Sequence, residues 1–363
     1  MSNKKLVVLG IVAVLMVVWA VVQSRISRRH WTKPDTPVYL IQGLNPDDIG
    51  SIVLGTGDDA VTLKRIEGRF VVVNKDNYPA VTGKINELIT SCLDIRTSEL
   101  YTDDPANHKD LGVTEQDARS VVKFFKPNSE PLVGIVIGNT KEQGQGSFVR
   151  LTSSDKVYVT LKSPWIDQRA MNYIDQKLLS LDRKDIESVT VTGPNDVYTL
   201  HAKEGQGIVL EEDIPEGKKL KGSDYEQVFN ALTSLRFDDV KKASKAEKDL
   251  NFDRQYVCRL KNSTVYTIKV AQKDNKTYYI TCDAEFTDKT PITKEKEVES
   301  KEELKKKEAM LIARDKAKEF SRKHNGWIYV ISEYKAKNLT KRLSELLEDV
   351  TEDSAEADLV GEK

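Results

Sequence analysis

The sequence predicts an α+β protein in which a hydrophobic N-terminal transmembrane helix precedes two copies of one β-meander-plus-helix module. Three observations lead to this prediction. An uncharged, mostly apolar run covers residues 6–22, and the segment that begins at Asp48 recurs from Asp185. Each copy also combines strand-like alternation with a helix-like stretch, which is typical of a sheet with a helix packed on one face.

The first element is expected to be a membrane anchor. At about 1.5 Å per helical residue the apolar run extends roughly 25 Å, close to the roughly 30 Å of a bilayer's hydrocarbon core. The run is longer than the apolar core of an export signal and lacks a good cleavage site, which favours an uncleaved anchor over a removed signal. We therefore assign residues 1–5 to a tail, 6–24 to the anchor and 25–46 to a linker. The expected anchor residues are Leu6, Leu9, Val14, Leu15, Trp19 and Val22.

Charges beside the anchor leave its orientation open. Two lysines precede the apolar run, and Arg25, Arg28 and Arg29 follow it. The positive-inside tendency alone would place the larger part of the chain in the cytoplasm. Short N-terminal anchors in bacteria usually export the body, and this is the orientation that we expect.

The body is expected to contain a duplication. The segment "DIGSIVLGTGDDAVTL" begins at Asp48, and "DIESVTVTGPNDVYTL" begins at Asp185. Both predict a β-hairpin with one buried face. The expected inward residues are Ile52, Leu54, Val61 and Leu63 in the first copy and Val189, Val191, Val197 and Leu200 in the second. A second echo joins "KDLGVTEQDARSVVKFF" from Lys109 to "KDLNFDRQYVCRLKN" from Lys248.

Between these echoes each copy has a stretch with helical periodicity. The stretches are "TGKINELITSCLDI" from Thr82 and "KGSDYEQVFNALTSL" from Lys221, with Thr82 and Ser223 as expected N-caps. Their apolar faces are predicted to consist of Ile85, Leu88, Ile89 and Cys92 in the first copy and Tyr225, Val228, Phe229 and Leu232 in the second.

Each copy is expected to close with paired strands and a helix. Residues 147–161 predict a hairpin, followed by a helix within 163–181; residues 277–286 and 326–334 take the hairpin's place in the second copy, followed by a helix over 336–350. The predicted modules are therefore 47–182 and 183–347. The acidic tail, residues 348–363, is expected to lack fixed structure.

A charged helix is predicted inside the second copy, over residues 294–323. The stretch is rich in helix formers and contains neither Gly nor Pro. Met310, Ala313, Ala317 and Phe320 form one narrow apolar stripe. This helix either lies on its own domain or docks a partner helix, and in the second case the candidate docking residues are Leu304, Met310, Ala313, Ala317 and Phe320.

The composition excludes some classes of function. The net charge of −1, from 56 basic and 57 acidic residues, gives no positive field for nucleic acid. The three cysteines show no CxxC spacing, so Cys258 and Cys282 either bridge neighbouring strands or remain buried thiols.

No motif for catalysis, metal binding or cofactor binding stands out, and we expect none of these sites. The four histidines have no metal-ligand spacing, and the glycine-containing segment 137–148 is interpreted as a loop between strands. Asp103, Asp104 and His108 form the one local polar cluster worth testing as a hydrolase site, although their surroundings are typical of a turn.

The chain resembles the domain of unknown function 4340 family along nearly its whole length. The resemblance rests on the N-terminal anchor and on "DIGSIVL", "GRFVVVNKDNYPAVTGKINELITSCLDI", "KDLGVTEQDARSVVKFF", "VGIVIGN" and "SFVRLTSSDKVYVTLKSPWIDQ". It implies a bacterial, membrane-anchored protein of a kind that is often found with gliding-type ABC transporter components. Together with the orientation expected above, this places a single-pass protein in the inner membrane with an extracytoplasmic body. It implies no activity and no functional residues.

These observations predict a non-enzymatic interaction protein that assists an ABC-transporter-like membrane complex. One alternative is a module that binds an extracytoplasmic glycan or peptide in a cleft between the copies, with Trp165 and Tyr173 as candidate contacts. The other is an unrecognised hydrolase. The oligomeric state is left open.

Overall fold

The chain forms two compact units in the computed structural model, which describes residue 16 and residues 38–350 apart from 143, 204, 247–248, 275 and 291–299. Of the described residues, unit 1 contains those from 38 to 65 together with Ile85–Gln168, and unit 2 contains Ile66–Lys84 together with residues 169–350. The residues predicted to form the anchor, Leu6, Leu9, Val14, Leu15, Trp19 and Val22, lie outside the described residues.

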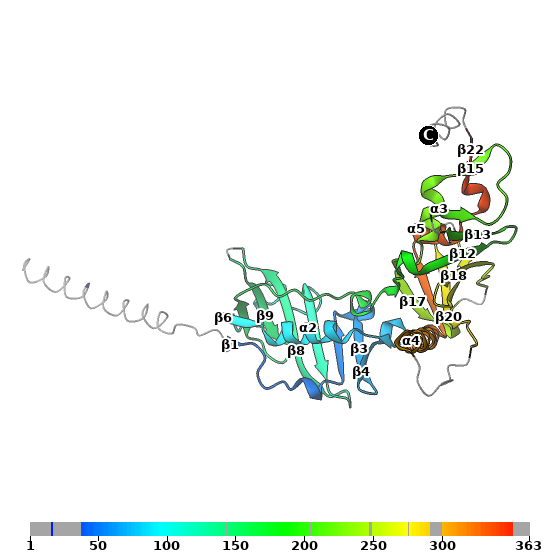
Figure 1. Ribbon diagram of the computed structural model, residues 1–363. Coiled ribbons are helices and arrows are strands. Elements are labelled where there is room, and N and C mark those ends of the chain that lie inside the picture. Colours follow the sequence, from blue (N-terminus) through cyan, green and yellow to red (C-terminus); the bar gives the residue numbers. More distant parts are fainter. Residues whose placement is uncertain are drawn as a thin grey trace, which may run out of the picture. The chain divides into compact units, whose positions relative to one another are not determined.

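Unit 1 is built on an antiparallel sheet with the order β1-β6-β10-β9-β8-β7-β2-β3 (Figure 1). Its strands are β1 (Val38–Tyr39), β2 (Ser51–Leu54), β3 (Val61–Ile66), β6 (Arg96–Thr102), β7 (Ser120–Phe125), β8 (Pro131–Thr140), β9 (Ser147–Leu151) and β10 (Val157–Thr160). The predicted hairpin is present as β2 and β3, with Ile52 opposite Leu63. The predicted pairing within 147–161 is present as β9 and β10.

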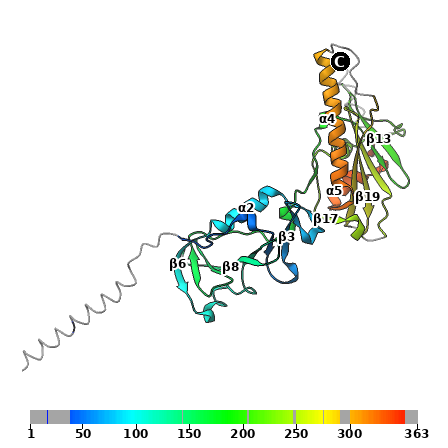
Figure 2. The same ribbon diagram turned by 90° about the horizontal axis from the view of Figure 1, so that it is seen from below.

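Both faces of this sheet bury apolar side chains. Helix α2 (Thr82–Leu93) runs along the sheet in Figures 1 and 2, and it buries Ile85, Leu88, Ile89 and Cys92, as predicted. Another buried cluster consists of Val113, Val121, Val136, Phe148, Val157 and Val159. Successive strand residues point to opposite faces, which explains why β7 contains two consecutive buried valines, Val121 and Val122.

Unit 2 is built on a second antiparallel sheet with the order β14-β13-β12-β18-β19-β20-β21-β17. Its strands are β12 (Ile186–Thr192), β13 (Val197–Lys203), β14 (Gly207–Leu210), β17 (Asp239–Lys242), β18 (Arg254–Leu260), β19 (Thr264–Gln272), β20 (Tyr278–Phe286) and β21 (Trp327–Ile331). Two short antiparallel pairs also lie in this unit: β11 (Lys177–Leu179) with β16 (Leu235–Arg236), and β15 (Lys218–Leu220) with β22 (Leu347–Asp349). Strands β4 (Arg69–Val72) and β5 (Tyr78–Pro79) pair with each other and follow β3 in the ten-stranded order of the first sheet.

Three helices pack on strands of this second sheet. They are α3 (Gly222–Phe229), α4 (Lys301–His324) and α5 (Glu333–Thr340). Helix α3 contacts β12, α5 contacts β12, β18 and β19, and α4 contacts β19 and β20. Buried tyrosines fix this packing, because the Tyr256 hydroxyl donates to the Val228 carbonyl at 2.7 Å and the Tyr198 hydroxyl donates to the Lys341 carbonyl at 2.8 Å.

The two units share one strand order. Strands β6-β10-β9-β8-β7-β2-β3 of unit 1 correspond one by one to β17-β21-β20-β19-β18-β12-β13 of unit 2. Each unit also has a helix, α2 or α3, between its first hairpin and its four-stranded meander. The sequence echo between the copies therefore has a structural counterpart, and α4 is an insertion between β20 and β21.

A segment of the first copy belongs to unit 2, so the predicted boundary at residue 182 does not divide the two units. Within residues 66–84, Asp76 accepts hydrogen bonds from the Lys242 amide at 2.9 Å and from Lys245 Nζ at 2.6 Å. Lys75 pairs with Asp239 at 2.7 Å. The Tyr78 ring is buried against Trp327, at 4.8 Å between ring centroids.

The predicted fold class is wrong. The described residues are mainly β-sheet with the helices α2–α5, and they contain no helix that is both long and apolar enough to span a membrane. The prediction of an α+β chain with a leading transmembrane helix overestimated the helical part, since two of the helices expected in the body are absent or much shorter.

Long-range pairing explains both of these differences. The helix expected within 163–181 is replaced by a short 3-10 turn, Ala170–Tyr173, and by β11, which pairs with β16. The helix expected over 336–350 ends at Thr340, because the chain then enters β22. The tail expected from residue 348 also overlaps this strand.

Two finer predictions fail as well. Helix α3 begins at Gly222, and its N-cap is Lys221 instead of Ser223. Val197 is 55% exposed, while Tyr198 and Leu200 are buried. Val197 and Leu200 are an odd number of residues apart, so they cannot share one face of a strand.

Candidate interaction surface

Helix α4 begins at a strong local start signal. Ser300 is the N-cap, and its hydroxyl accepts from the Glu303 amide at 3.2 Å while the Glu303 carboxylate accepts from the Ser300 amide at 2.8 Å. This capping box satisfies two amides that the first helical turn leaves unpaired. The helix expected within 294–323 is therefore confirmed, with its described part running from Lys301 to His324.

One face of α4 packs on its own unit. Ala313, Ala317 and His324 are buried. The Phe320 ring meets the Tyr266 ring of β19 edge-on at 5.2 Å, and the Ser321 hydroxyl donates to the Asp283 carboxylate of β20. Of the two readings of the apolar stripe, the structure supports the one in which it covers its own domain.

The opposite face of α4 exposes large apolar side chains. Leu304, Leu311 and Ile312 are 52%, 37% and 47% exposed. Leu304 and Leu311 are seven residues apart, close to two turns, so they lie on the same side of the helix. Ala313 lies nine residues after Leu304, which places it two and a half turns away, on the other side.

The predicted docking residues are thus divided between the two faces. Leu304 is exposed, Met310 and Phe320 are partly buried, and Ala313 and Ala317 are buried. Sequence reasoning missed Leu311 and Ile312, although the heptad spacing of Leu304 and Leu311 could have indicated them.

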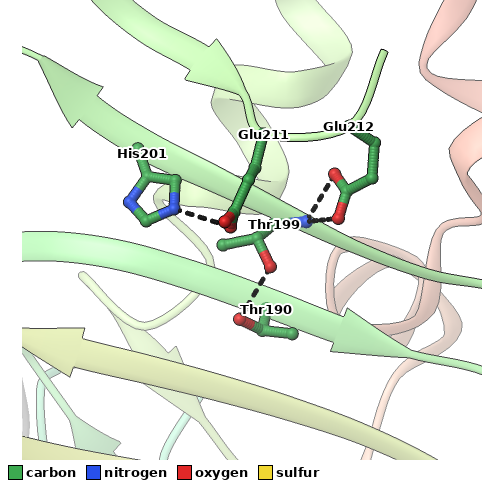
Figure 3. A network of polar contacts seen from close by, with 5 residues as sticks. All are labelled: Thr190, Thr199, His201, Glu211 and Glu212. Atoms are coloured by element: carbon green, nitrogen blue, oxygen red, sulfur yellow. Dashed lines mark hydrogen bonds and ion pairs between the residues drawn. The ribbon is translucent and has the colours of Figure 1, made fainter. Parts of the chain in front are cut away.

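A polar network lies at the edge of the unit 2 sheet and contains Thr190, Thr199, His201, Glu211 and Glu212 (Figure 3). His201 Nε2 lies 2.9 Å from Glu211 Oε2. The Glu212 carboxylate accepts from the Thr199 amide at 2.9 and 3.1 Å, and the Thr199 hydroxyl lies 3.1 Å from the Thr190 hydroxyl. Figure 3 shows both glutamates beside β13, with His201 and Thr199 directed to different carboxylates, so the network links strand edges and brings no hydroxyl to the imidazole.

The residues proposed for a hydrolase do not converge. The Asp104 carboxylate accepts from the Ala106 amide at 3.0 Å and caps the short 3-10 turn Pro105–Asn107. His108 is buried, and its Nε2 lies 2.9 Å from the Asp155 carbonyl. The turn interpretation of this segment is therefore confirmed.

The two aromatic residues proposed to contact a ligand differ in accessibility. Trp165 is 78% exposed in unit 1, whereas Tyr173 is buried in unit 2. Arg119 holds the segment that precedes Trp165 through Nη2, which donates to the Ser163 hydroxyl at 2.9 Å and to the Pro164 carbonyl at 3.0 Å. A ligand in contact with both aromatic rings stays a prediction.

The cysteines are free, buried thiols. Cys258 lies on β18 and Cys282 on β20, and β19 pairs with both strands and so separates them. Burial raises the pKa of the Cys258 thiol to about 12. Among the described residues, no group of three or more His, Cys, Asp and Glu side chains is placed to hold a metal ion.

Comparison with protein families gives one result that decides the family. The model of a domain of unknown function, DUF4340, matches residues 71–255, just over half of the chain. The chain belongs to the DUF4340 family. The match runs from β4 of unit 2 through unit 1 to β18. The matched region of this DUF4340 protein therefore covers part of each copy of the module. No curated protein and no solved structure matches the chain.

Proposed function

We propose that this DUF4340 protein is a non-enzymatic interaction protein that docks onto a partner through the outer face of α4. The observation that supports this proposal is the exposure of Leu304, Leu311 and Ile312 on a helix whose opposite face is already buried. Single exposed apolar residues are common, but three within nine residues of one helix form a patch of the kind found at protein interfaces.

The partner that we propose presents an apolar helix. Leu304 and Leu311 are one heptad apart, which is the spacing at which two helices pack side by side. The family resemblance leads us to propose a membrane complex of the ABC-transporter type as the source of this helix. The body of the protein would then act at the bacterial inner membrane, on the extracytoplasmic side.

Charged substitutions on this face test the proposal. We expect the double variant Leu304→Asp with Leu311→Asp to lower the recovery of co-purifying membrane proteins at least about tenfold, the effect of about 1.4 kcal/mol in binding free energy. The measurement is quantitative mass spectrometry of proteins that are recovered from native membranes with the tagged full-length chain.

Val197→Asp serves as the matched control, since Val197 is an exposed apolar residue of the same unit on β13. It should leave partner recovery unchanged. The proposed docking face would be overturned if the wild-type chain and the double variant recovered equal amounts of membrane proteins. This comparison requires that the two chains have equal expression and the same circular dichroism spectrum.

A further inference from the structure

The second half of α4 carries a row of cationic side chains. Arg314, Lys318 and Arg322 follow one another at intervals of four residues, so neighbouring cations are about 6 Å apart along the helix axis. With Ser321 of α4, Asn325 directly after α4 and the end of β20, they line a pocket of about 520 Å³. The row and the concave wall opposite it therefore form one site within unit 2.

These cations have no ionic partner in the described part of the chain. None of them forms a salt bridge there, and the buried Nε of Arg314 has no hydrogen-bond acceptor. A buried guanidinium donor without an acceptor is unfavourable, and no hydrogen bond of its Nε holds the Arg314 side chain in place. Arg322 lies in the last turn, where the helix dipole favours a cation, but Arg314 and Lys318 lie too far from that end to benefit.

Two carboxylates also line the pocket. The Asp288 carboxylate is engaged, because it accepts from the Thr290 amide at 2.8 Å. Glu285 is exposed at the end of β20 and remains available as an acceptor. The site thus offers three cations in a row and one free carboxylate beside them.

We propose that this pocket binds an acidic polypeptide segment. Alternate side chains of an extended strand are about 6.6–6.8 Å apart, close to the spacing of the three cations, so carboxylates at every second residue would meet them in succession. Glu285 would accept a backbone N–H of the same segment. The proposal rests on the proposed function for the existence of a protein partner, and it adds the chemistry by which that partner is recognised.

The arrangement favours a peptide over a phosphate group. A phosphate group would concentrate its negative charge close to Glu285 and Asp288, whereas an extended polypeptide can place carboxylates against the cations and an amide donor against Glu285. A polypeptide carries both acceptors and donors, in its carboxylates and its amides. Both kinds of group in the pocket are then satisfied.

A direct titration tests this proposal. The probe is a fluorescent peptide of four Glu-Ser repeats, measured by fluorescence anisotropy with the purified full-length chain at low ionic strength. We expect the triple variant Arg314→Gln, Lys318→Gln, Arg322→Gln to weaken binding at least about tenfold, since it removes all three charge-assisted contacts. Added salt should weaken the binding of the wild-type chain.

The matched control removes the same charge from the same helix. Lys301, Lys305 and Lys316 are exposed on α4 outside the pocket, and their replacement by Gln should change the affinity less than twofold. A peptide of four Gln-Ser repeats should not bind. Equal losses in the two triple variants, binding of the Gln-Ser peptide, or displacement of the Glu-Ser peptide by an equal concentration of inorganic phosphate would each overturn the proposal.

One further variant separates this proposal from the proposed function. The double variant Leu304→Asp with Leu311→Asp should bind the Glu-Ser peptide as the wild-type chain does, because these leucines lie outside the pocket. If only the triple variant of Arg314, Lys318 and Arg322 loses peptide binding, the acidic ligand is supported. This holds even if all variants recover equal amounts of membrane partners. Absence of peptide binding by the wild-type chain refutes the acidic ligand and leaves the apolar docking face to its own test.

Discussion

At the scale of single residues, His324 shows how burial of a titratable group links stability to pH. His324 is 3% exposed at the end of α4, and its Nδ1 lies 2.6 Å from the Tyr329 hydroxyl of β21. Burial, with a smaller contribution from the charge of Lys323, lowers the pKa of His324 to about 4. An unfolded histidine has a pKa of about 6.5, so the folded state favours the neutral ring.

This difference predicts an acid-dependent loss of stability in unit 2. Between pH 6.5 and pH 4 the unfolded chain binds a proton at His324 more readily than the folded chain does. The free energy of unfolding is therefore at its full value above pH 6.5 and decreases as the pH falls. We expect unit 2 to lose about 2 kcal/mol of unfolding free energy between pH 7.5 and pH 5. The measurement is urea denaturation followed by Trp327 fluorescence in a chain whose other tryptophans are replaced by Phe.

A variant that cannot titrate provides the control. His324→Gln keeps a polar side chain but should show a pH dependence that is smaller by about the same 2 kcal/mol. If the variant and the parent chain lose equal stability between these pH values, then His324 is not the group responsible.

At the scale of elements, the edge of the unit 2 sheet is closed by a side chain. Strand β14 pairs with β13 only as far as Leu200 opposite Leu210, and the Glu211 amide then donates to the Thr199 carbonyl at 2.9 Å. The Glu212 carboxylate accepts from the Thr199 amide at the same point (Figure 3). Unpaired edge groups are a template for pairing with another chain, and here a carboxylate occupies that position.

Replacing either of the two neighbouring glutamates by Ala should therefore change the stability of unit 2 by different amounts. Glu212→Ala leaves the partly buried Thr199 amide without its acceptor and should lower the stability of unit 2 by about 1–3 kcal/mol. Glu211→Ala removes only an exposed contact with His201 and should cost less than about 1 kcal/mol. Denaturant midpoints measure both effects, and light scattering should show greater self-association for Glu212→Ala alone. Equal midpoints for the two variants would contradict this account of the edge.

Elements whose contacts are local in sequence could be predicted, and those that depend on distant partners could not. The face of α2 follows from apolar residues three and four apart, and the β2–β3 hairpin follows from alternation around a turn. In contrast, β11 pairs with β16, so Lys177 lies opposite Arg236, and no feature near Lys177 indicates this partner. The same applies to Leu347, whose partner in β15 is Leu220.

The candidate surface shows the same limit. The spacing of Arg314, Lys318 and Arg322 is visible in the sequence and indicates one side of a helix. Their function as a row that lines a pocket depends on the end of β20, which lies beside them only in the fold. The apolar stripe of α4 was likewise visible, but only its contact with Tyr266 shows that this stripe is directed inward.

At the scale of the whole molecule, the duplication did not produce two independent modules. The two sheets share one strand order, yet residues 66–84 of the first copy belong to unit 2. Asp76 there adopts a left-handed conformation, with φ of 56°, which Asp tolerates better than most residues and which places its carboxylate against Lys242 and Lys245. Unit 2 is therefore completed by a segment that comes more than eighty residues before the rest of it.

This arrangement predicts that a substitution in the first copy destabilises the second unit. Tyr78 is 4% exposed, and its ring packs against those of Phe237, Trp327 and Tyr329, at 5.9, 4.8 and 6.3 Å between centroids. We expect Tyr78→Ala to lower the unfolding free energy of unit 2 by about 3–5 kcal/mol, because it removes a buried aromatic side chain and leaves a cavity. Native-state hydrogen exchange should show faster exchange in β20 and β21, with β7 and β8 of unit 1 unchanged.

The same chemical change at Tyr101 is the control, because Tyr101 is a tyrosine of unit 1 that is 51% exposed. Tyr101→Ala should leave exchange in β20 and β21 as it is in the wild-type chain, and surface substitutions of this kind usually change stability by less than about 0.5 kcal/mol. The opposite result for Tyr78→Ala, faster exchange in β7 and β8 with unchanged exchange in β20 and β21, would contradict this prediction. It would mean that residues 66–84 stabilise unit 1, the unit of the first copy. The predicted pattern would instead mean that residues 66–84, although they belong to the first copy in sequence, stabilise the second unit.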